Sequence, residues 1–131
     1  MVRMEDPDFP EALRAFIREH IPDVDAAELL LKLAREPGRE HAVPTLVGEL
    51  QPSAISEATA RRHLSSFEER GLVQSVGDLF RYSPASTDVD ACVQALMRVY
   101  NARPVTMVRV IYALRDEKIR SFADAFRIKK K

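Results

Sequence analysis

The fold is decided by residues 56–84, which read SEATARRHLSSFEERGLVQSVGDLFRYSP. Ser56 can cap the start of a helix, because a serine hydroxyl accepts a hydrogen bond from an unpaired amide of the first turn. Apolar side chains then recur at helical spacing on one face, at Ala60, Leu64 and Phe67. Gly71 suits the left-handed backbone position that follows a helix. The stretch therefore predicts a helix that starts after Ser56 and ends just before Gly71.

A hairpin and further helices surround this segment. Residues 72–76 and 79–82 are β-prone, and the Gly77-Asp78 pair between them is a turn signal. Upstream, the spacing of apolar residues predicts helices over residues 8–20, 24–35 and 43–50. The middle one is apolar around much of its circumference, so we expect it to be buried on more than one side.

Helices followed by a hairpin in this order resemble the winged helix-turn-helix of bacterial transcription regulators. The resemblance rests on three runs, LVGEL at 46–50, SEATARRHL at 56–64 and FEERGLV at 67–73. The last run is similar to the end of the recognition helix in MarR-like and ArsR-like regulators. The turn at residues 51–55 is longer than in the tightest members of the family. The resemblance covers residues 25–85 and implies a mainly α fold with a three-helix core and a short β-hairpin wing.

The chain of 131 residues has room for one domain with its own core. We divide that domain into an N-terminal helix in residues 1–22, a winged helix-turn-helix in residues 23–85 and a C-terminal helical region in residues 86–131. Within the last region, residues 105–114 are apolar on most sides and residues 116–128 predict a separate final helix. A helix that is apolar on most sides must be covered by more than one neighbour.

The C-terminal helices either cap the winged helix within one chain or pair with a second copy. A cap would pack residues 105–114 against the first helix near Phe16 and Ile17. Regulators of the resembled type are mostly dimers, because two half-sites match a palindromic operator. We expect a homodimer whose interface is formed by apolar residues of this region: Val105, Val108, Ile111, Tyr112, Phe122 and Phe126.

The resemblance implies that the helix at residues 56–70 reads double-stranded DNA in the major groove. Such a helix needs short or polar side chains toward the base edges and cations toward the phosphates. Residues off the apolar face, with one arginine of the returning strand, form the expected DNA-binding set: Ser56, Ala58, Thr59, Arg61, Arg62, Ser65 and Arg81. The expected function is sequence-specific DNA binding by a transcription regulator. The alternative is a non-enzymatic protein-interaction adaptor on a winged-helix scaffold, in which these arginines are solvated surface charges.

The charge balance gives no support to general binding of nucleic acid. Lys and Arg number 20, as do Asp and Glu, so the formal net charge is zero. Residues 88–131 hold ten bases and five acids and end in Lys129-Lys130-Lys131. This basic C-terminal helix is either a solvated helix end or a contact for an acidic protein partner. No apolar stretch is long enough to span a bilayer and the N-terminus has no apolar signal core, so we expect a cytoplasmic protein.

The sequence offers no pattern of catalytic or metal-binding residues, so we expect no enzyme activity, no metal and no cofactor. His20, His41 and His63 are far apart, with no pair at the spacing of helical metal ligands. Cys92 lies on an apolar helix face and reads as a small hydrophobe. No glycine-rich phosphate loop, nucleophile elbow or distinctive pair of carboxylates is present.

Overall fold

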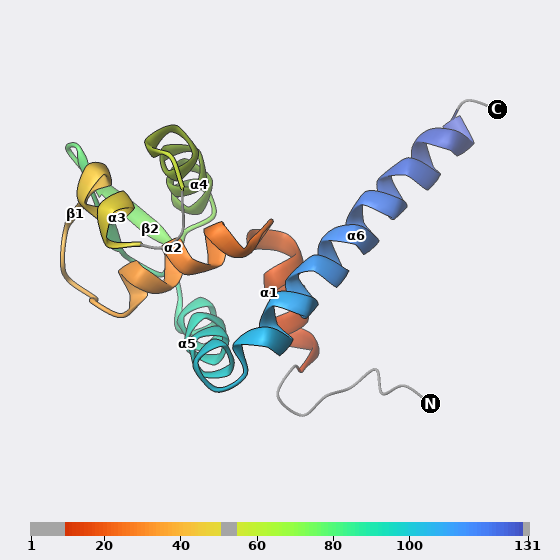
Figure 1. Ribbon diagram of the computed structural model, residues 1–131, viewed down its shortest axis with the longest axis horizontal. Helices are drawn as coiled ribbons and strands as arrows, with labels where there is room; N and C mark the ends of the chain where they lie inside the picture. The colour runs from red at the N-terminus through yellow and green to blue at the C-terminus, as the bar shows by residue number, and fades with distance from the viewer. Residues whose placement is uncertain (1–9, 51–54, 130–131) are drawn as a thin grey trace.

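The computed structural model describes residues 10–50 and 55–129, with side chains described up to residue 120 (Figure 1). This part of the chain is mainly helical and includes a small antiparallel sheet of three strands in the order β1-β3-β2. The elements are α1 (Glu11–His20), α2 (Val24–Ala34), β1 (His41–Ala42), α3 (Val43–Glu49), α4 (Glu57–Glu69), β2 (Val73–Val76), β3 (Leu79–Tyr82), α5 (Thr87–Ala102) and α6 (Pro104–Lys129).

The helix predicted in the deciding stretch is α4, and its two ends form as the residue types require. The Ser56 hydroxyl accepts a hydrogen bond from the Thr59 amide at 3.1 Å. After the helix, Gly71 adopts φ +79°, and the next amide, that of Leu72, donates to the Phe67 carbonyl at 2.9 Å. The predicted inner face of the helix is confirmed, because Ala60, Leu64 and Phe67 are all buried.

The predicted hairpin is also present, and it carries a third strand that the sequence did not reveal. Strands β2 and β3 pair from Val73 opposite Tyr82 to Val76 opposite Leu79. On the other edge of β3, His41 pairs with Phe80 and Ala42 with Leu79. Strand β1 is only two residues long, yet it joins the start of α3 to the hairpin.

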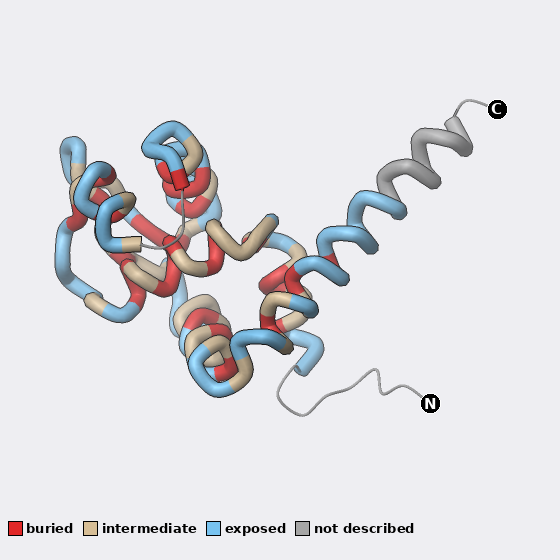
Figure 2. Tube along the Cα trace, in the orientation of Figure 1, coloured by how far each residue is buried: buried red, intermediate tan, exposed pale blue. Residues whose placement is uncertain are grey.

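Helix α2 is the centre of the core. Leu29, Leu30, Leu31 and Leu33 are each at most 1% exposed, which confirms that this helix is buried on several sides. The helix contacts α4, α5 and β3, and α4 and α5 lie on opposite sides of it (Figure 1). Figure 2 shows the buried residues gathered along α2 and on the inner faces of its neighbours. Helix α4 is therefore supported from behind by a helix whose leucines are almost completely buried.

Two tyrosines attach α5 to the body of the molecule. The Tyr82 hydroxyl donates to Asp90 Oδ1 at 2.6 Å, and the Tyr100 hydroxyl donates to Glu28 Oε2 at 2.9 Å. Burial, together with the hydrogen bond to Glu28, raises the pKa of Tyr100 to about 12. Burial and the hydrogen bond to Asp90 also raise the pKa of Tyr82. Both phenols therefore stay protonated donors near neutral pH, and α5 is held to β3 and α2 by hydrogen bonds as well as by apolar contacts.

The prediction of two separate C-terminal helices is wrong, because α6 runs unbroken over 26 residues. Residues 114–117 read LRDE and contain neither proline nor glycine, so nothing there interrupts the helical hydrogen bonds. The first half of α6 packs on α1 and α5 through buried Met107, Ile111 and Leu114. Glu117 and Lys118 still contact α1, since Arg18 Nη2 lies 3.4 Å from Glu117 Oε1 and Lys118 Nζ lies 3.4 Å from the Arg18 carbonyl oxygen. The far end of the helix extends away from the rest of the molecule (Figure 1).

The described residues of α6 after Leu114, at positions 115–120, are all exposed. The helix thus caps the body with its first half, and its described residues beyond Leu114 are exposed. No helix in the described part of the chain is long and apolar enough to cross a membrane.

Candidate nucleic-acid interface

The outer face of α4 brings most of the expected DNA-binding residues together. Ala58, Arg61, Arg62 and Ser65 are exposed and follow one another at helical spacing of three and four residues, so they share one side of the helix. This side is opposite to the buried face that packs on α2. The result is a helix whose exposed side carries two cations and two short side chains, with the exposed Glu69 at the end of the same side.

Ser56 and Thr59 lie at the start of the same helix, where both side chains serve the cap. The Ser56 hydroxyl donates to Thr59 Oγ1 at 3.0 Å while it accepts from the Thr59 amide. Ser56 is exposed and Thr59 is half-buried. Their first role is therefore to fix where α4 begins, which sets the direction in which the two arginines project.

Arg61 and Arg62 form no ion pair or side-chain hydrogen bond with any residue that the structure describes. Other arginines of this region differ. Arg70, after the end of α4, lies 3.8 Å from Glu19 Oε1. Unpaired guanidinium groups on a helix keep their full charge and all their donors available to an external anion.

Arg81 on β3 is not part of this unpaired set. Its guanidinium donates to Gln74 Oε1 at 2.8 Å and lies 3.8 Å from Glu40 Oε2. The side chain is half-buried, so it is tied across the sheet rather than projected from the wing. At the tip of the hairpin, Val76, Gly77 and Asp78 are exposed and offer no cation.

The acids of α4 are divided between solvent and structure. Glu57 and Glu69 are exposed. Glu68 accepts two hydrogen bonds from Ser75, at 2.7 Å from the hydroxyl and at 3.1 Å from the amide. These bonds hold the pKa of Glu68 below its usual value. Glu68 therefore ties the end of α4 to β2 and does not neutralise either arginine.

His63 fixes the inner side of α4. It is buried, and its Nε2 lies 3.5 Å from Oδ1 of Asp23. The same carboxylate oxygen caps α2 by accepting a hydrogen bond from the Ala26 amide at 2.8 Å. The His63 ring also stacks on Phe67, with 6.4 Å between ring centroids. This contact holds the α4 backbone against the start of α2 and gives His63 a structural role.

The expected dimer residues of α6 divide into two faces. Val105 and Tyr112 are 65% and 46% exposed, and Val108 between them is half-buried. Ile111 is fully buried within its own chain, so the structure contradicts its assignment to a dimer interface. The side chains of Phe122 and Phe126, like those of the lysines at the C-terminus, lie outside the described residues. The expected set did not include Ile119, which is 56% exposed and stands seven residues after Tyr112.

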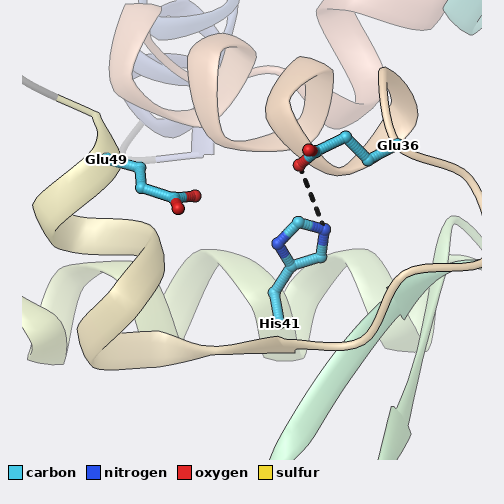
Figure 3. Close-up of side chains that lie close together, drawn as sticks. All are labelled: Glu36, His41 and Glu49. Carbon is cyan, nitrogen blue, oxygen red and sulfur yellow. Dashed lines mark ion pairs between the residues drawn. The ribbon is translucent and has the colours of Figure 1, made fainter.

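The described residues also contain a group of possible metal ligands that the sequence did not indicate. Glu36, His41 and Glu49 come from the loop after α2, from β1 and from the end of α3 (Figure 3). Burial and the neighbouring Arg39 keep the pKa of His41 below its usual value. No regular spacing links these residues, and only the pairing of β1 with β3 and the turn into α3 bring them together.

A cavity lies behind α4. It is a cavity of about 340 Å³ between the ends of α1 and α4 and the middle of α6. Its charged lining is mostly basic, with Arg18, Arg70, Arg115 and Lys118 against Glu19 and Asp23.

Comparison of the chain with protein-family models, with curated proteins and with solved structures finds no match in any of the three.

Proposed function

We propose that this chain is a sequence-specific, DNA-binding transcription regulator of the winged-helix type. The order of elements supports this proposal, since α2, α3 and α4 are followed by the β2–β3 hairpin and joined to it by β1. In this arrangement α4 is the recognition helix and the hairpin is a short wing. The paired state of Arg81 and the exposed Asp78 at the tip limit the wing to contacts with the DNA backbone.

The observation that carries the proposal is the pair of unpaired arginines on the outer side of α4. A guanidinium can donate two hydrogen bonds to the O6 and N7 atoms of guanine, and it can also neutralise phosphate. Ala58 and Ser65 on the same side are short enough to let the helix approach the base edges. We assign base contact to Arg61 and phosphate contact to Arg62.

The outer face of α6 supports a homodimer as the binding form. Val105, Tyr112 and Ile119 are exposed and stand seven residues apart, which is the repeat of a helix-pairing seam. The sequence continues this repeat to Phe126, and the intermediate positions are Val108, Arg115 and Phe122. Pairing of two such helices covers an apolar stripe that a single chain leaves in water. It also provides two recognition helices for a two-fold operator.

The proposal is tested by selection of duplexes from randomised DNA, followed by titration of the selected sequence. Arg61→Ala should weaken binding by about 1–3 kcal/mol and relax the preference at one base position. Arg62→Ala should weaken binding to all sequences and lower the slope of log Kd against log salt by about one. Arg98→Ala is the matched control, since Arg98 is exposed on α5, across α2 from α4.

The outcomes separate DNA binding from the adaptor alternative. If selection enriches no sequence, or if both α4 variants bind the selected duplex as the parent does, α4 is not a DNA-reading helix. The exposed Glu57 and Glu69 beside the arginines would then favour the adaptor, because a mixed-charge helix face suits a protein partner.

A further inference from the structure

Three potential ligands from separate elements meet between α2 and α3. One donor atom from each of Glu36, His41 and Glu49 can be chosen such that all three lie within 4.8 Å of one another. In Figure 3 the imidazole of His41 lies between the two carboxylates, and one ring nitrogen faces Glu36. Because the ligands come from a loop, a strand and a helix, the geometry depends on the fold and not on a local turn.

The polar atoms at the centre of this group lack hydrogen-bond partners. The His41 side chain is 0% exposed, and neither of its ring nitrogens has a hydrogen-bond partner among the described residues. Glu36 Oε1 is in the same position, and its distance of 3.8 Å from His41 Nε2 is too long for a hydrogen bond. A buried polar atom without a hydrogen-bond partner destabilises the folded chain. Such atoms in a folded protein point to an ion or water that completes the site.

We propose that Glu36, His41 and Glu49 form a binding site for one divalent transition-metal ion of the zinc type. A neutral imidazole and two carboxylates are ligands that Zn²⁺ accepts at about 2.0–2.2 Å, with water in the fourth position. The imidazole nitrogen disfavours Mg²⁺ and Ca²⁺, which prefer oxygen ligands. Metal binding would draw the three donors closer together than they stand now. This inference is independent of DNA binding.

Two cationic side chains form ion pairs with the two carboxylates, so a metal ion must compete with them for these ligands. Lys32 Nζ lies 3.2 Å from Glu49 Oε1 and 3.7 Å from Glu36 Oε1. The Arg39 guanidinium lies 2.8 Å from Glu36 Oε2 and 3.6 Å from Glu49 Oε2. Partly exposed ion pairs of this kind contribute little to stability. Both side chains can turn into solvent, so they lower the affinity for a cation without blocking it.

The test is metal titration of the untagged, chelator-treated chain. Zn²⁺ affinity is measured by competition with a chromophoric chelator, and Co²⁺ is used as a spectroscopic probe. We expect one ion per chain and visible Co²⁺ absorption of a four-coordinate site. Glu49→Gln and Glu36→Gln should each lower Zn²⁺ affinity by about tenfold or more, since loss of a mere outer-shell partner already costs about 10–100-fold. Both residues are partly exposed, so these variants are expected to fold.

A second pair of variants separates this site from adventitious binding at another histidine. Arg39→Gln should tighten Zn²⁺ binding, because it removes a cation that competes for both carboxylates. His20→Gln should leave the affinity unchanged, since His20 lies on α1, away from the three ligands. The proposal is overturned if the parent chain binds no Zn²⁺, or if binding is unaffected by both glutamate substitutions. Loss of binding in His20→Gln would equally overturn it.

Discussion

At the scale of single residues, Gly71 makes a demand that no other residue type meets without strain. Its φ of +79° lies in the left-handed region, and a Cβ atom added to it would stand 3.0 Å from the Cβ of Ala85. We expect Gly71→Ala to lower the free energy of unfolding by at least about 1–2 kcal/mol, the usual cost of the left-handed conformation for an L-residue. Urea denaturation followed by circular dichroism measures the loss.

Gly48 supplies the matched control for this substitution. It lies within α3, and a Cβ atom added there would meet nothing within 4 Å. Gly48→Ala should therefore stabilise the chain by about 0.5–1 kcal/mol, because alanine loses less backbone freedom than glycine in a helix. Equal effects of the two substitutions would show that the turn after α4 does not require its left-handed residue.

At the scale of elements, the buried face of α4 decides whether the candidate interface is held rigid. Leu64 is fully buried and Phe67 is 1% exposed. Replacement of either residue by alanine leaves a cavity between α4 and the helices behind it. The expected loss is about 2–5 kcal/mol for each variant, measured as a shift in the urea midpoint.

Ser65 lies on the same helix as these two residues but faces solvent, so Ser65→Ala should change stability by no more than about 0.5 kcal/mol. If Ser65→Ala destabilised the chain as much as Leu64→Ala, the assignment of the outer and inner faces of α4 would be wrong.

The elements also show which parts of the fold the sequence can predict. Helix α4 could be read from its cap, its apolar spacing and its terminal glycine, because all three are local signals. Strand β1 could not, because two residues have no periodicity and are held as a strand only by pairing with β3. For the same reason the arginines of α4 were found from sequence, whereas Glu36, His41 and Glu49 were not.

The prediction for α6 was wrong for the opposite reason, because a local signal was given too much weight. Residues 105–114 and 116–128 differ strongly in polarity, and this difference suggested two helices where the backbone forms one. The change in polarity marks where the side chains of α6 become exposed, not where the helix ends. Ile111 was misassigned for a related reason, since an all-round apolar helix does not reveal from sequence which of its faces points inward.

At the scale of the whole molecule, the exposed seam on α6 predicts association of two chains. The parent should sediment as a dimer at micromolar concentration. Val105→Glu combined with Tyr112→Glu should give a monomer with unchanged helix content, because both side chains are already exposed. Arg98→Glu, on the exposed surface of α5, should leave the dimer intact. A parent chain that sediments as a monomer would restrict α6 to its role as a cap.

Because α6 is unbroken, the directions in which its two halves point their side chains are fixed relative to each other. A helix of 26 residues is a rod of about 39 Å, in which each residue advances 1.5 Å and turns 100°. The position of Ile111 in the core therefore fixes the direction of the outer face at Tyr112, and of every later residue of the helix. One residue inserted after Leu114 would turn the far half through about 100° while the near half stayed seated in the core. Seven inserted residues would return it almost to its original direction, so the length of this helix, as well as its composition, sets the orientation of whatever docks along its outer face.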